Sequence, residues 1–382
     1  MNKKQFFLTI FMTMIVTVVL MTAAALWALG LDADTAKNAV RFVVARRFIE
    51  TQYVNEVDDK KLTDGAISGM MKSLDDPHSL YLDSEMYKAL REHTESSFGG
   101  IGVVMGVRDG KIVAISVMED NPGAKAGLKA DDQILAVDGE SVTDMELDKV
   151  VMKVRGEAGT DVVLTIHREG EEDRDYKITR GTIKVKTAAG KMQDDGIGYI
   201  RITSFGEDTA EEFDKEYKKL SDAGMKGLII DLRENPGGLV NTCTDIAKAL
   251  VPKGPIVSVV RRDGSTEEYT SDLDAAPMPI VVLIDKNSAS ASEILAGALK
   301  DTGAATLVGT KSYGKGSVQI VMPLVDDDAL KLTIAKYYTP SGVCIDGTGI
   351  EPDVPISFDM DAAASGKDVQ LEKAMEVMRE KL

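Results

Sequence analysis

Strand-like and helix-like patterns alternate through the second half of the chain. The apolar runs IGYIRITSF, GLIIDLR, PIVVLID and ATLVGT have the length and β-branched content of buried strands. Amphipathic patterns between them predict helices near 208–223, 239–250 and 290–300. This alternation predicts a largely parallel sheet with right-handed crossovers, and therefore an α/β core domain over 184–362. Two more strand-like runs, SVQIVMPLV and ALKLTIAKYY, follow, and a C-terminal segment over 363–382 holds a last charged helix.

Residues 96–183 have a different pattern, with short strands separated by tight turns. IGVVMGV and KIVAISV flank an Arg-Asp-Gly turn, which predicts a β-hairpin. A short Ala-rich helix, a strand over 133–137, an amphipathic helix over 145–154 and the strand DVVLTIHR come next. The segment therefore reads as a small α+β domain inserted before the α/β core.

Residues 31–95 are predicted to be helical. The stretch 41–54 places Phe42, Phe48, Ile49 and Tyr53 near one face of a helix, and a second helix is expected near 62–74. The segment is too small to be an enzyme, so we expect it to pack against the rest of the chain or against a second copy. Together with the C-terminal helix it suggests self-association, with a homodimer and a monomer both left open.

The first thirty residues form an apolar segment preceded by two lysines. Residues 5–29 carry no charge, and a run of ~20 apolar residues suffices to span a bilayer. The length favours an uncleaved membrane anchor over residues 1–30, although Thr22–Ala25 also offers the small residues of a signal-peptide cleavage site. In either case the lysines stay in the cytoplasm. The expected location is the cell membrane, single-pass, with the rest of the chain in the periplasm or at the cell surface.

Composition excludes several classes of function. The chain has 382 residues and a net charge of −17, which argues against nucleic-acid binding because phosphates need clustered Lys and Arg. Its two cysteines form neither a metal-ligand spacing nor a disulfide framework, and no residue cluster suggests a metal or organic cofactor. None of the three histidines follows residue 167. A Ser-His-Asp, Cys-His or H-E-x-x-H site therefore cannot be built within the α/β domain.

One candidate nucleophile lies just after a buried strand. In NSASASEILAGALKD, Ser288, Ser290 and Ser292 alternate with alanine at the junction between that strand and a helix. A serine placed there can expose its hydroxyl, and the next amide, that of Ala291, can stabilise an oxyanion at the helix N-terminus. Helix capping by serine is the competing interpretation.

Two further motifs complete a possible catalytic set. In DLRENPGGLV, Gly237 and Gly238 leave a stretch of backbone uncovered by side chains after another buried strand, so their amides are candidate oxyanion donors. A plain Pro-Gly turn is the alternative interpretation. In GTKSYGKGSVQ, Lys315 enters an apolar strand, and burial that lowered its pKa from ~10.4 toward neutrality would make it a base. Gln319 lies four residues on and would share its strand face. An exposed turn lysine is the competing interpretation.

The small α+β domain resembles a PDZ domain of the bacterial, exported type. The specific signature is AKAGLKADDQILAVDG, residues 124–139. PDZ domains bind an extended peptide as an added strand, and a Gly-rich loop can turn its amides onto the terminal carboxylate. The resemblance thus implies that substrate tails bind at SFGGIGV, with these contact residues: Gly99, Gly100, Ile101, Gly102 and Val103.

The chain as a whole resembles the C-terminal processing (tail-specific) peptidases from about residue 36 to 355. The shared motifs are LDDPHSLYL, the PDZ signature, DLRENPGG, NSASASEILAGALKD, GTKSYGKGSVQ and YYTPSG…GIEPDV, in the family's order. The resemblance implies a serine–lysine dyad, Ser290 and Lys315, on a core similar to the crotonase and Clp-protease fold. Gln319 would support the lysine, and Ala291 with Gly237 or Gly238 would form the oxyanion hole. Cys344 departs from the family pattern without an expected catalytic consequence.

The expected function is therefore that of an exported serine endopeptidase that binds the accessible C-termini of protein substrates and cuts through an acyl-enzyme. A membrane-anchored, non-catalytic PDZ adaptor is the alternative, although an adaptor has no need for both Ser290 and Lys315. An acyl-CoA enzyme would fit the core fold, but the export signal argues against it because CoA chemistry is cytoplasmic.

Overall fold

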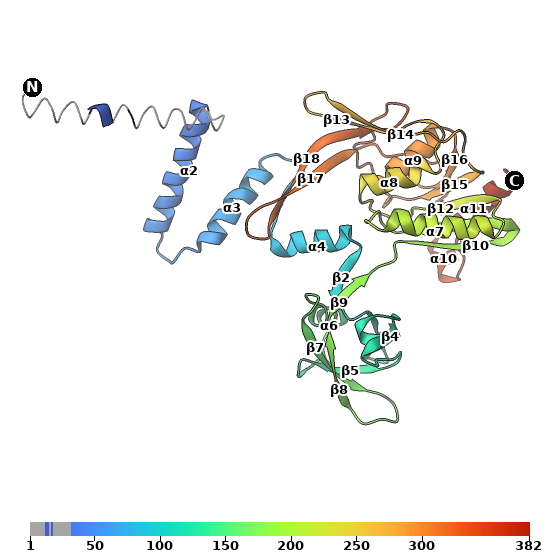
Figure 1. Ribbon diagram of the computed structural model, residues 1–382, viewed down its shortest axis with the longest axis horizontal. Helices are drawn as coiled ribbons and strands as arrows, with labels where there is room; N and C mark the ends of the chain where they lie inside the picture. The colour runs from blue at the N-terminus through green and yellow to red at the C-terminus, as the bar shows by residue number, and fades with distance from the viewer. Residues whose placement is uncertain (1–11, 15–16, 18–31) are drawn as a thin grey trace, which may run out of the picture. The chain divides into compact units, whose positions relative to one another are not determined.

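The computed structural model describes residues 12–14, 17 and 32–382, which divide into the compact units Met1–Tyr81 and Leu82–Leu382 (Figure 1). Within these described residues, no helix is long and apolar enough to cross a membrane. The predicted anchor over 5–29 lies outside the described residues, except at 12–14 and 17. The anchor therefore stays a prediction from the sequence.

From residue 32 on, the first unit contains the helices α2 (Ala33–Gln52) and α3 (Asp59–Lys72). Both begin at an aspartate whose carboxylate accepts a backbone N–H of the first turn, which satisfies one of the otherwise unpaired helix amides. The pattern predicted both helices, but α2 begins earlier than expected. Its apolar side chains are exposed, Phe42 by 50% and Phe48 by 67%, so this face of the helix has no cover within its own unit.

The second unit begins with β1 (Leu80–Leu82), which crosses the unit boundary, and α4 (Ser84–Thr94). The small α+β domain follows. Strands β2 (Ser97–Gly100) and β9 (Gly181–Lys184) pair antiparallel at its base. A further sheet has the order β3-β4-β5-β7-β8, with β6 beside β5. These strands are β3 (Val103–Arg108), β4 (Lys111–Val117), β5 (Gln133–Val137), β6 (Glu140–Ser141), β7 (Asp161–His167) and β8 (Arg174–Thr179).

Two helices complete the small domain, α5 (Pro122–Lys125) and α6 (Leu147–Val154). Val150 and Val154 of α6 pack with Ile134, Val162 and Leu164 of the sheet in a core separate from that of the α/β domain. The predicted hairpin, strand and amphipathic helix are all present, so the pattern identified the domain correctly.

A separate six-stranded sheet forms the centre of the α/β core, in the order β10-β11-β12-β15-β16-β19. Its strands are β10 (Ala188–Met192), β11 (Ile197–Ile202), β12 (Gly227–Asp231), β15 (Ile280–Ile284), β16 (Ala305–Gly309) and β19 (Val354–Pro355), and a 3₁₀ turn, η1 (Asp194–Gly196), joins the first two. All neighbours pair in parallel except β10 and β11. Every residue of β12 and β15 is buried, which is why both read as continuous apolar runs.

Helices cover both faces of this sheet. Helices α7 (Thr209–Asp222), α8 (Val240–Lys248) and α9 (Ala291–Asp301) share one core with the alternate strand residues Leu228 and Ile230. On the other face, α11 (Val369–Arg379) packs against Ile229 and Leu283 (Figure 1). The predicted C-terminal helix is therefore present, but its apolar side is buried on its own chain, because the second face of a buried parallel sheet needs a cover.

A separate antiparallel sheet contains β17 (Ser317–Pro323), β18 (Ala329–Tyr338), β13 (Gly254–Arg261) and β14 (Thr266–Ser271), paired in that order. The short helix α10 (Met360–Ala364) precedes α11. The predicted fold class is confirmed for the α/β core, the small α+β domain and the helical ends; the likeness to the crotonase and Clp-protease folds stays a prediction.

Candidate active site

Ser290 occupies a strained backbone conformation between β15 and α9. Its φ is 54° and its ψ is −115°, a region that residues with a Cβ rarely adopt. Such a residue costs of order 1–3 kcal/mol and persists only where the surroundings hold it. Ser290 is half-buried, whereas its neighbours Ser288 and Ser292 are fully buried. Of the three alternating serines, Ser290 is therefore the one that a substrate can reach.

The two buried serines join this segment to the loop after β12. The Ser288 hydroxyl donates to the Leu232 carbonyl at 2.8 Å, and the Ser292 hydroxyl donates to the Asn235 carbonyl at 3.0 Å. The Ala289 amide donates to that same Asn235 carbonyl at 3.0 Å. The structure thus brings together the two segments that the sequence analysis chose for the nucleophile and the oxyanion hole.

Gly237 lies directly against the Ser290 segment. A Cβ at Gly237 would meet the Ala289 carbonyl oxygen at 2.6 Å and the Ser290 Cβ at 2.8 Å, and the φ of 99° also excludes ordinary side chains. The Gly237 amide donates to the Asn235 side-chain oxygen at 2.9 Å. Within the described part of the chain, the structure gives no acceptor to the amides of Gly238 and Ala291. Those two amides are therefore the better placed to take an oxyanion.

Glu293 links the Ser290 segment to the loop that carries Lys315. Its carboxylate is fully buried and accepts the amides of Ser290 and Lys315 on Oε2, each at 2.9 Å. On Oε1 it accepts the Ser312 hydroxyl at 2.6 Å and the Gly314 amide at 2.7 Å. One carboxylate thereby fixes the backbone of both predicted catalytic residues.

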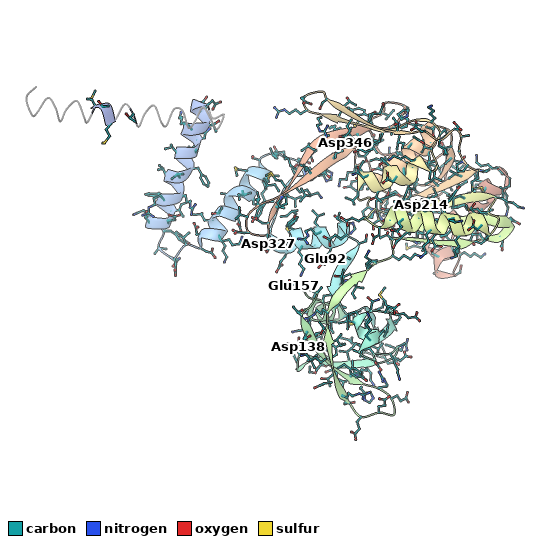
Figure 2. All side chains as sticks on the ribbon, viewed as in Figure 1. Glu92, Asp138, Glu157, Asp214, Asp327 and Asp346 are labelled. Carbon is teal, nitrogen blue, oxygen red and sulfur yellow. The ribbon has the colours of Figure 1, made fainter. Side chains whose placement is uncertain are left out.

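Tyr337 of β18 forms a second link between the same two segments. Its hydroxyl donates to the Lys315 carbonyl and lies 3.1 Å from the Ser290 carbonyl oxygen. Burial, followed by the charge of Glu293, raises the pKa of the Tyr337 hydroxyl, so this group remains a donor. A third contact holds the Lys315 loop, because the Gly316 amide donates to the Asp346 carboxylate at 3.2 Å. Asp346 is labelled in Figure 2.

Gln319 lies on β17 and points its amide at neighbours on the sheet. Its Nε2 donates to the Ser317 hydroxyl at 3.0 Å and to the Thr333 hydroxyl at 3.2 Å. Strand β17 begins at Ser317, so Lys315 precedes it, and a register shift follows Val318. Strand alternation therefore does not extend from Lys315 to Gln319, and the supporting role of Gln319 stays a prediction.

The five predicted peptide-binding residues lie in three different settings. Gly99 and Gly100 belong to β2 and pair with β9. Ile101 is buried in the core of the small domain, and the Gly102 carbonyl accepts the Met118 amide at 2.9 Å. Val103 opens β3, which is an edge strand of its sheet and contacts α6. An edge strand beside a helix is the setting for peptide addition, so the candidate groove runs along β3 from Val103 onward.

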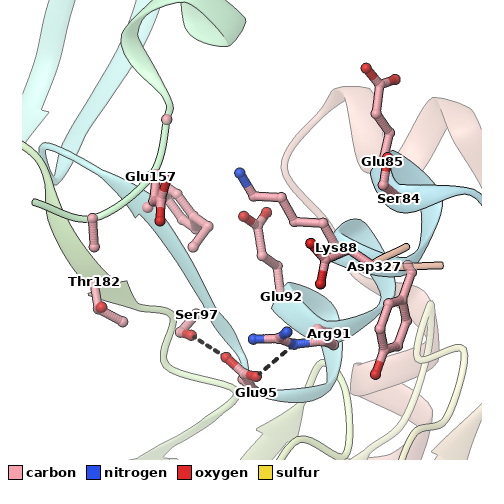
Figure 3. Close-up of a pocket in the computed structure, with 15 residues that line it drawn as sticks. Ser84, Glu85, Lys88, Arg91, Glu92, Glu95, Ser97, Glu157, Thr182 and Asp327 are labelled. Carbon is pink, nitrogen blue, oxygen red and sulfur yellow. Dashed lines mark hydrogen bonds and ion pairs between the residues drawn. The ribbon is translucent and has the colours of Figure 1, made fainter. Parts of the chain in front are cut away.

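A cavity of about 500 Å³ lies beside α4 and β2, away from the Ser290 segment (Figure 3). Charged side chains of α4, among them Lys88, Arg91 and Glu92, line it together with the backbone of Gly99 and Gly156. No predicted catalytic residue lines this cavity, and its charged lining is unlike the mainly apolar lining of most ligand sites. We therefore assign it no role in the chemistry.

Sequence reasoning missed Glu293 and Tyr337. The S-x-x-E spacing of Ser290 and Glu293 is a capping-box signature, which was the available signal for the local bond. Tyr337 opens the shared motif YYTPSG, but nothing in that motif indicated a bond to the catalytic segments. Both cysteines are free, Cys243 being buried with its thiol donating to the Ala291 carbonyl at 3.0 Å. Among the residues that the structure describes, no cluster of three or more His, Cys, Asp or Glu side chains suits a metal ion.

Three family models match the chain: peptidase family S41 over 196–356, a PDZ domain over 113–168, and the N-terminal domain of the activating protease CtpB over 30–86. The carboxy-terminal-processing protease of Bartonella bacilliformis is 41% identical over 353 residues, 89% of this chain and 80% of the relative. The carboxy-terminal processing protease CtpB of Bacillus subtilis is 40% identical over 341 residues, 88% of this chain and 71% of the relative.

Among solved structures, the photosystem II D1 C-terminal processing protease is similar, with 30% identity and a TM-score of 0.50 over 83% of this chain and 86% of that one. Relatives of this kind do not favour a non-catalytic adaptor. The chain belongs to the carboxy-terminal processing proteases of peptidase family S41, which are serine peptidases, and it carries a PDZ domain.

Proposed function

We propose that this protease works outside the cytoplasm, binds the C-terminal tail of a protein substrate in its PDZ domain, and cuts peptide bonds with Ser290 and Lys315. The observation that carries the assignment is the shared contact with Glu293, whose Oε2 accepts the amides of both residues at 2.9 Å. The half-buried, strained position of Ser290 supports it, since strain of this kind clusters at active sites.

In the first half of the proposed reaction, the neutral amine of Lys315 takes the proton of the Ser290 hydroxyl as its oxygen attacks the carbonyl carbon of the scissile bond. Negative charge develops on the carbonyl oxygen and is stabilised by the amides of Ala291 and Gly238. The intermediate collapses, the C–N bond breaks, and Lys315 returns the proton to the leaving amine. Ser290 then holds the substrate as an ester.

In the second half, water attacks the ester carbonyl while Lys315 accepts a proton from it. The same two amides stabilise the second oxyanion, and the C–O bond to Ser290 breaks as Lys315 returns the proton to the serine oxygen.

Recognition of the substrate tail is proposed to occur by strand addition along β3, opposite α6. Val103 and Met105 of β3 are partly buried against the core that contains α6 and would supply apolar contacts, while the turn at Ile101 and Gly102 lies at the end of the strand where a terminal carboxylate would sit. Occupancy of this groove is further proposed to align the dyad. A tail peptide added in trans should then raise cleavage of an unrelated reporter, and an unchanged rate would exclude this coupling.

The remaining organisation is proposed from the sequence resemblance. We expect residues 1–30 to anchor the chain or direct its export, residues 31–95 to support a homodimer, and residues 184–362 to form a crotonase- and Clp-protease-like core after a PDZ domain over 96–183. The proposed limit at 362 falls inside α10, so Asp359, which caps that helix, is the better boundary with the C-terminal segment.

The test is cleavage of an unfolded reporter with an apolar C-terminal tail by the full chain, by Ser290→Ala and by Lys315→Ala. Cleavage by the unaltered chain alone, with a fluorophosphonate adduct on the Ser290 peptide, supports the dyad. If Lys315→Ala cleaves at the normal rate, the lysine is not the base. If Ser290→Ala still cleaves, the nucleophile has been misassigned.

A further inference from the structure

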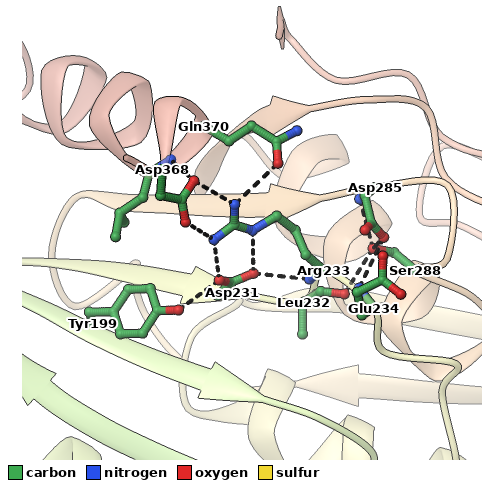
Figure 4. A network of polar contacts seen from close by, with 10 residues as sticks. Tyr199, Asp231, Leu232, Arg233, Glu234, Asp285, Ser288, Asp368 and Gln370 are labelled. Atoms are coloured by element: carbon green, nitrogen blue, oxygen red, sulfur yellow. Dashed lines mark hydrogen bonds and ion pairs between the residues drawn. The ribbon is translucent and has the colours of Figure 1, made fainter. Parts of the chain in front are cut away.

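Arg233 stands at the start of the loop that carries Gly237 and Gly238, and its guanidinium is held by a network of polar groups that is buried at Asp231 and Gln370 and 43% exposed at the Asp368 side chain (Figure 4). Its side chain is only 12% exposed. Nε and Nη2 donate to the two oxygens of Asp231, at 2.9 and 2.6 Å. Nη1 and Nη2 donate to the two oxygens of Asp368, both at 2.8 Å. Arg233 is therefore held by the carboxylate at the end of the preceding strand, β12, and by one from the C-terminal segment.

The other members of this network are each paired in turn. Asp231 is fully buried and accepts the Tyr199 hydroxyl at 2.7 Å. Gln370 is also buried; its side-chain oxygen accepts Nη1 of Arg233 at 3.1 Å, and its Nε2 donates to the Ile356 carbonyl at 2.9 Å. A buried polar network in which the members are satisfied is rigid and selects one arrangement of the backbone that carries it.

The C-terminal partner is itself firmly placed. Asp368 is the N-cap of α11 and accepts the Leu371 amide at 3.0 Å. From there α11 packs Ala374 and Met378 into the apolar core on one face of the sheet. At the far end of the helix, Arg379 donates to Asp195 at 2.7 Å on the surface. The helix therefore offers Arg233 a fixed carboxylate rather than a mobile one.

The loop beyond Arg233 leads directly to the proposed oxyanion hole. The next residue, Glu234, has a φ of 59°, and its amide donates to Asp285 at 3.0 Å. Asn235 then accepts the Ala289 amide, and Gly237 contacts Ser290. A shift of the backbone at the start of this short loop would therefore move the Gly238 amide, which is proposed to donate to the substrate carbonyl.

We propose that the C-terminal helix α11 is a clamp for the oxyanion loop, and that Asp368 is a positioning residue of the peptidase reaction, acting through Arg233. The inference rests on the proposed roles of Ser290 and of the loop amides. Asp368 lies in the last segment of the chain, 135 residues from Arg233 in the sequence. This segment would therefore affect the rate of the chemical step.

The test compares Asp368→Asn with Arg379→Gln in the full chain. Asparagine keeps the size and the helix-capping ability of Asp368 but removes one of the two carboxylate charges that hold Arg233, the other being that of Asp231. Arg379→Gln releases the opposite end of the same helix without touching Arg233. Active sites are counted by titration with a fluorophosphonate, so that kcat refers to folded enzyme only, and the thermal midpoint of each variant is recorded.

We expect kcat per active site to fall about 10-fold in Asp368→Asn with little change in KM, because small displacements of catalytic groups cost up to ~100-fold and only the clamp has been weakened. Arg379→Gln should keep the normal kcat. Asp368→Glu, which restores the charge, should recover part of the rate.

A kcat for Asp368→Asn within twofold of normal would overturn the inference. An equal loss of kcat in Asp368→Asn and Arg379→Gln would also overturn it, because α11 would then act only as a cover for the sheet. Ser290→Ala is measured beside both variants. If it abolishes cleavage while Asp368→Asn does not lower kcat, only the clamp fails and the proposed function stands. If it retains activity, the assignment of the nucleophile fails instead.

Discussion

Replacing Glu293 by glutamine tests whether one buried carboxylate holds the catalytic segments together. In one orientation of the new amide, its NH₂ group faces the Ser290 and Lys315 amides, so two buried donors lose their acceptor. In the other, it faces the Gly314 amide and the Ser312 hydroxyl, so one N–H loses its acceptor and the hydroxyl must turn. Neither orientation satisfies all four donors.

The size of the effect follows from these lost bonds. An unsatisfied buried donor costs about 1–3 kcal/mol, and bonds to a charged acceptor are at the upper end of this range. We therefore expect Glu293→Gln to lower the free energy of unfolding by roughly 2–4 kcal/mol, which is a large share of the usual ~5–15 kcal/mol. Because the Ser290 and Lys315 backbones separate, kcat per titrated active site should fall about 100-fold.

The assay is urea unfolding together with reporter cleavage, beside Glu211→Gln, which makes the same chemical change on the exposed first turn of α7. Glu211→Gln should change neither quantity. The reasoning is refuted if Glu293→Gln keeps kcat within twofold and loses less than about 0.5 kcal/mol, the range of ordinary surface substitutions.

Three further outcomes are expected. Ser290→Gly should be inactive yet roughly 1 kcal/mol more stable in urea unfolding than Ser290→Ala, because glycine tolerates the positive φ; equal stabilities would mean that the strain is absent. Gly237→Ala should lose about 2–4 kcal/mol and its activity, since the new Cβ meets the Ala289 carbonyl oxygen at 2.6 Å; normal cleavage would contradict this contact. Burial opposes ionisation of Asp132, but bonds from Arg168 and the Lys129 amide hold its pKa below the usual range. The ionised Asp132 therefore stabilises the folded PDZ domain above pH ~4, and this contribution is lost as the pH falls through the lowered pKa. In Asp132→Asn, the free energy of unfolding of the PDZ domain should fall less steeply as the solution is acidified.

Elements with a strong period were predictable from the sequence. The helix expected near 208–223 is α7 at Thr209–Asp222, and GLIID reads as a buried strand because both of its faces are covered. The pair β13 and β14 was not foreseen, because its strands are only partly buried and TEEYTS carries mainly exposed polar side chains. Strand β19 has only two residues, too few for a period to show, and β10, with the sequence AAGKM, is mostly exposed and has no apolar pattern.

Some features of the candidate active site could also be predicted from the sequence, and others could not. The pattern located the strands that precede Ser290, Ala291 and Gly237, so the place of these residues in the fold could be predicted. The bond from Ser290 to Glu293 is local and has a spacing signature. The bonds from Glu293 to Ser312 and Lys315, and from Arg233 to Asp368, join segments 19, 22 and 135 residues apart. No local pattern encodes them, because they depend on where the sheet places its loops.

The strain at Ser290 and the bonds around it have a single explanation. A residue at φ 54° stays there only if its surroundings over-determine its backbone. Here the Ser290 amide donates to the Glu293 carboxylate, while the Ser290 carbonyl accepts the Glu293 and Ile294 amides and lies beside the Tyr337 hydroxyl. Ser288 and Ser292 use their hydroxyls to hold the flanking backbone in place. These bonds fix the main chain of Ser290, while its side chain stays partly exposed. Residues that never touch the substrate, such as Glu293 and Tyr337, should for this reason govern the rate of cleavage more strongly than most residues of the substrate groove.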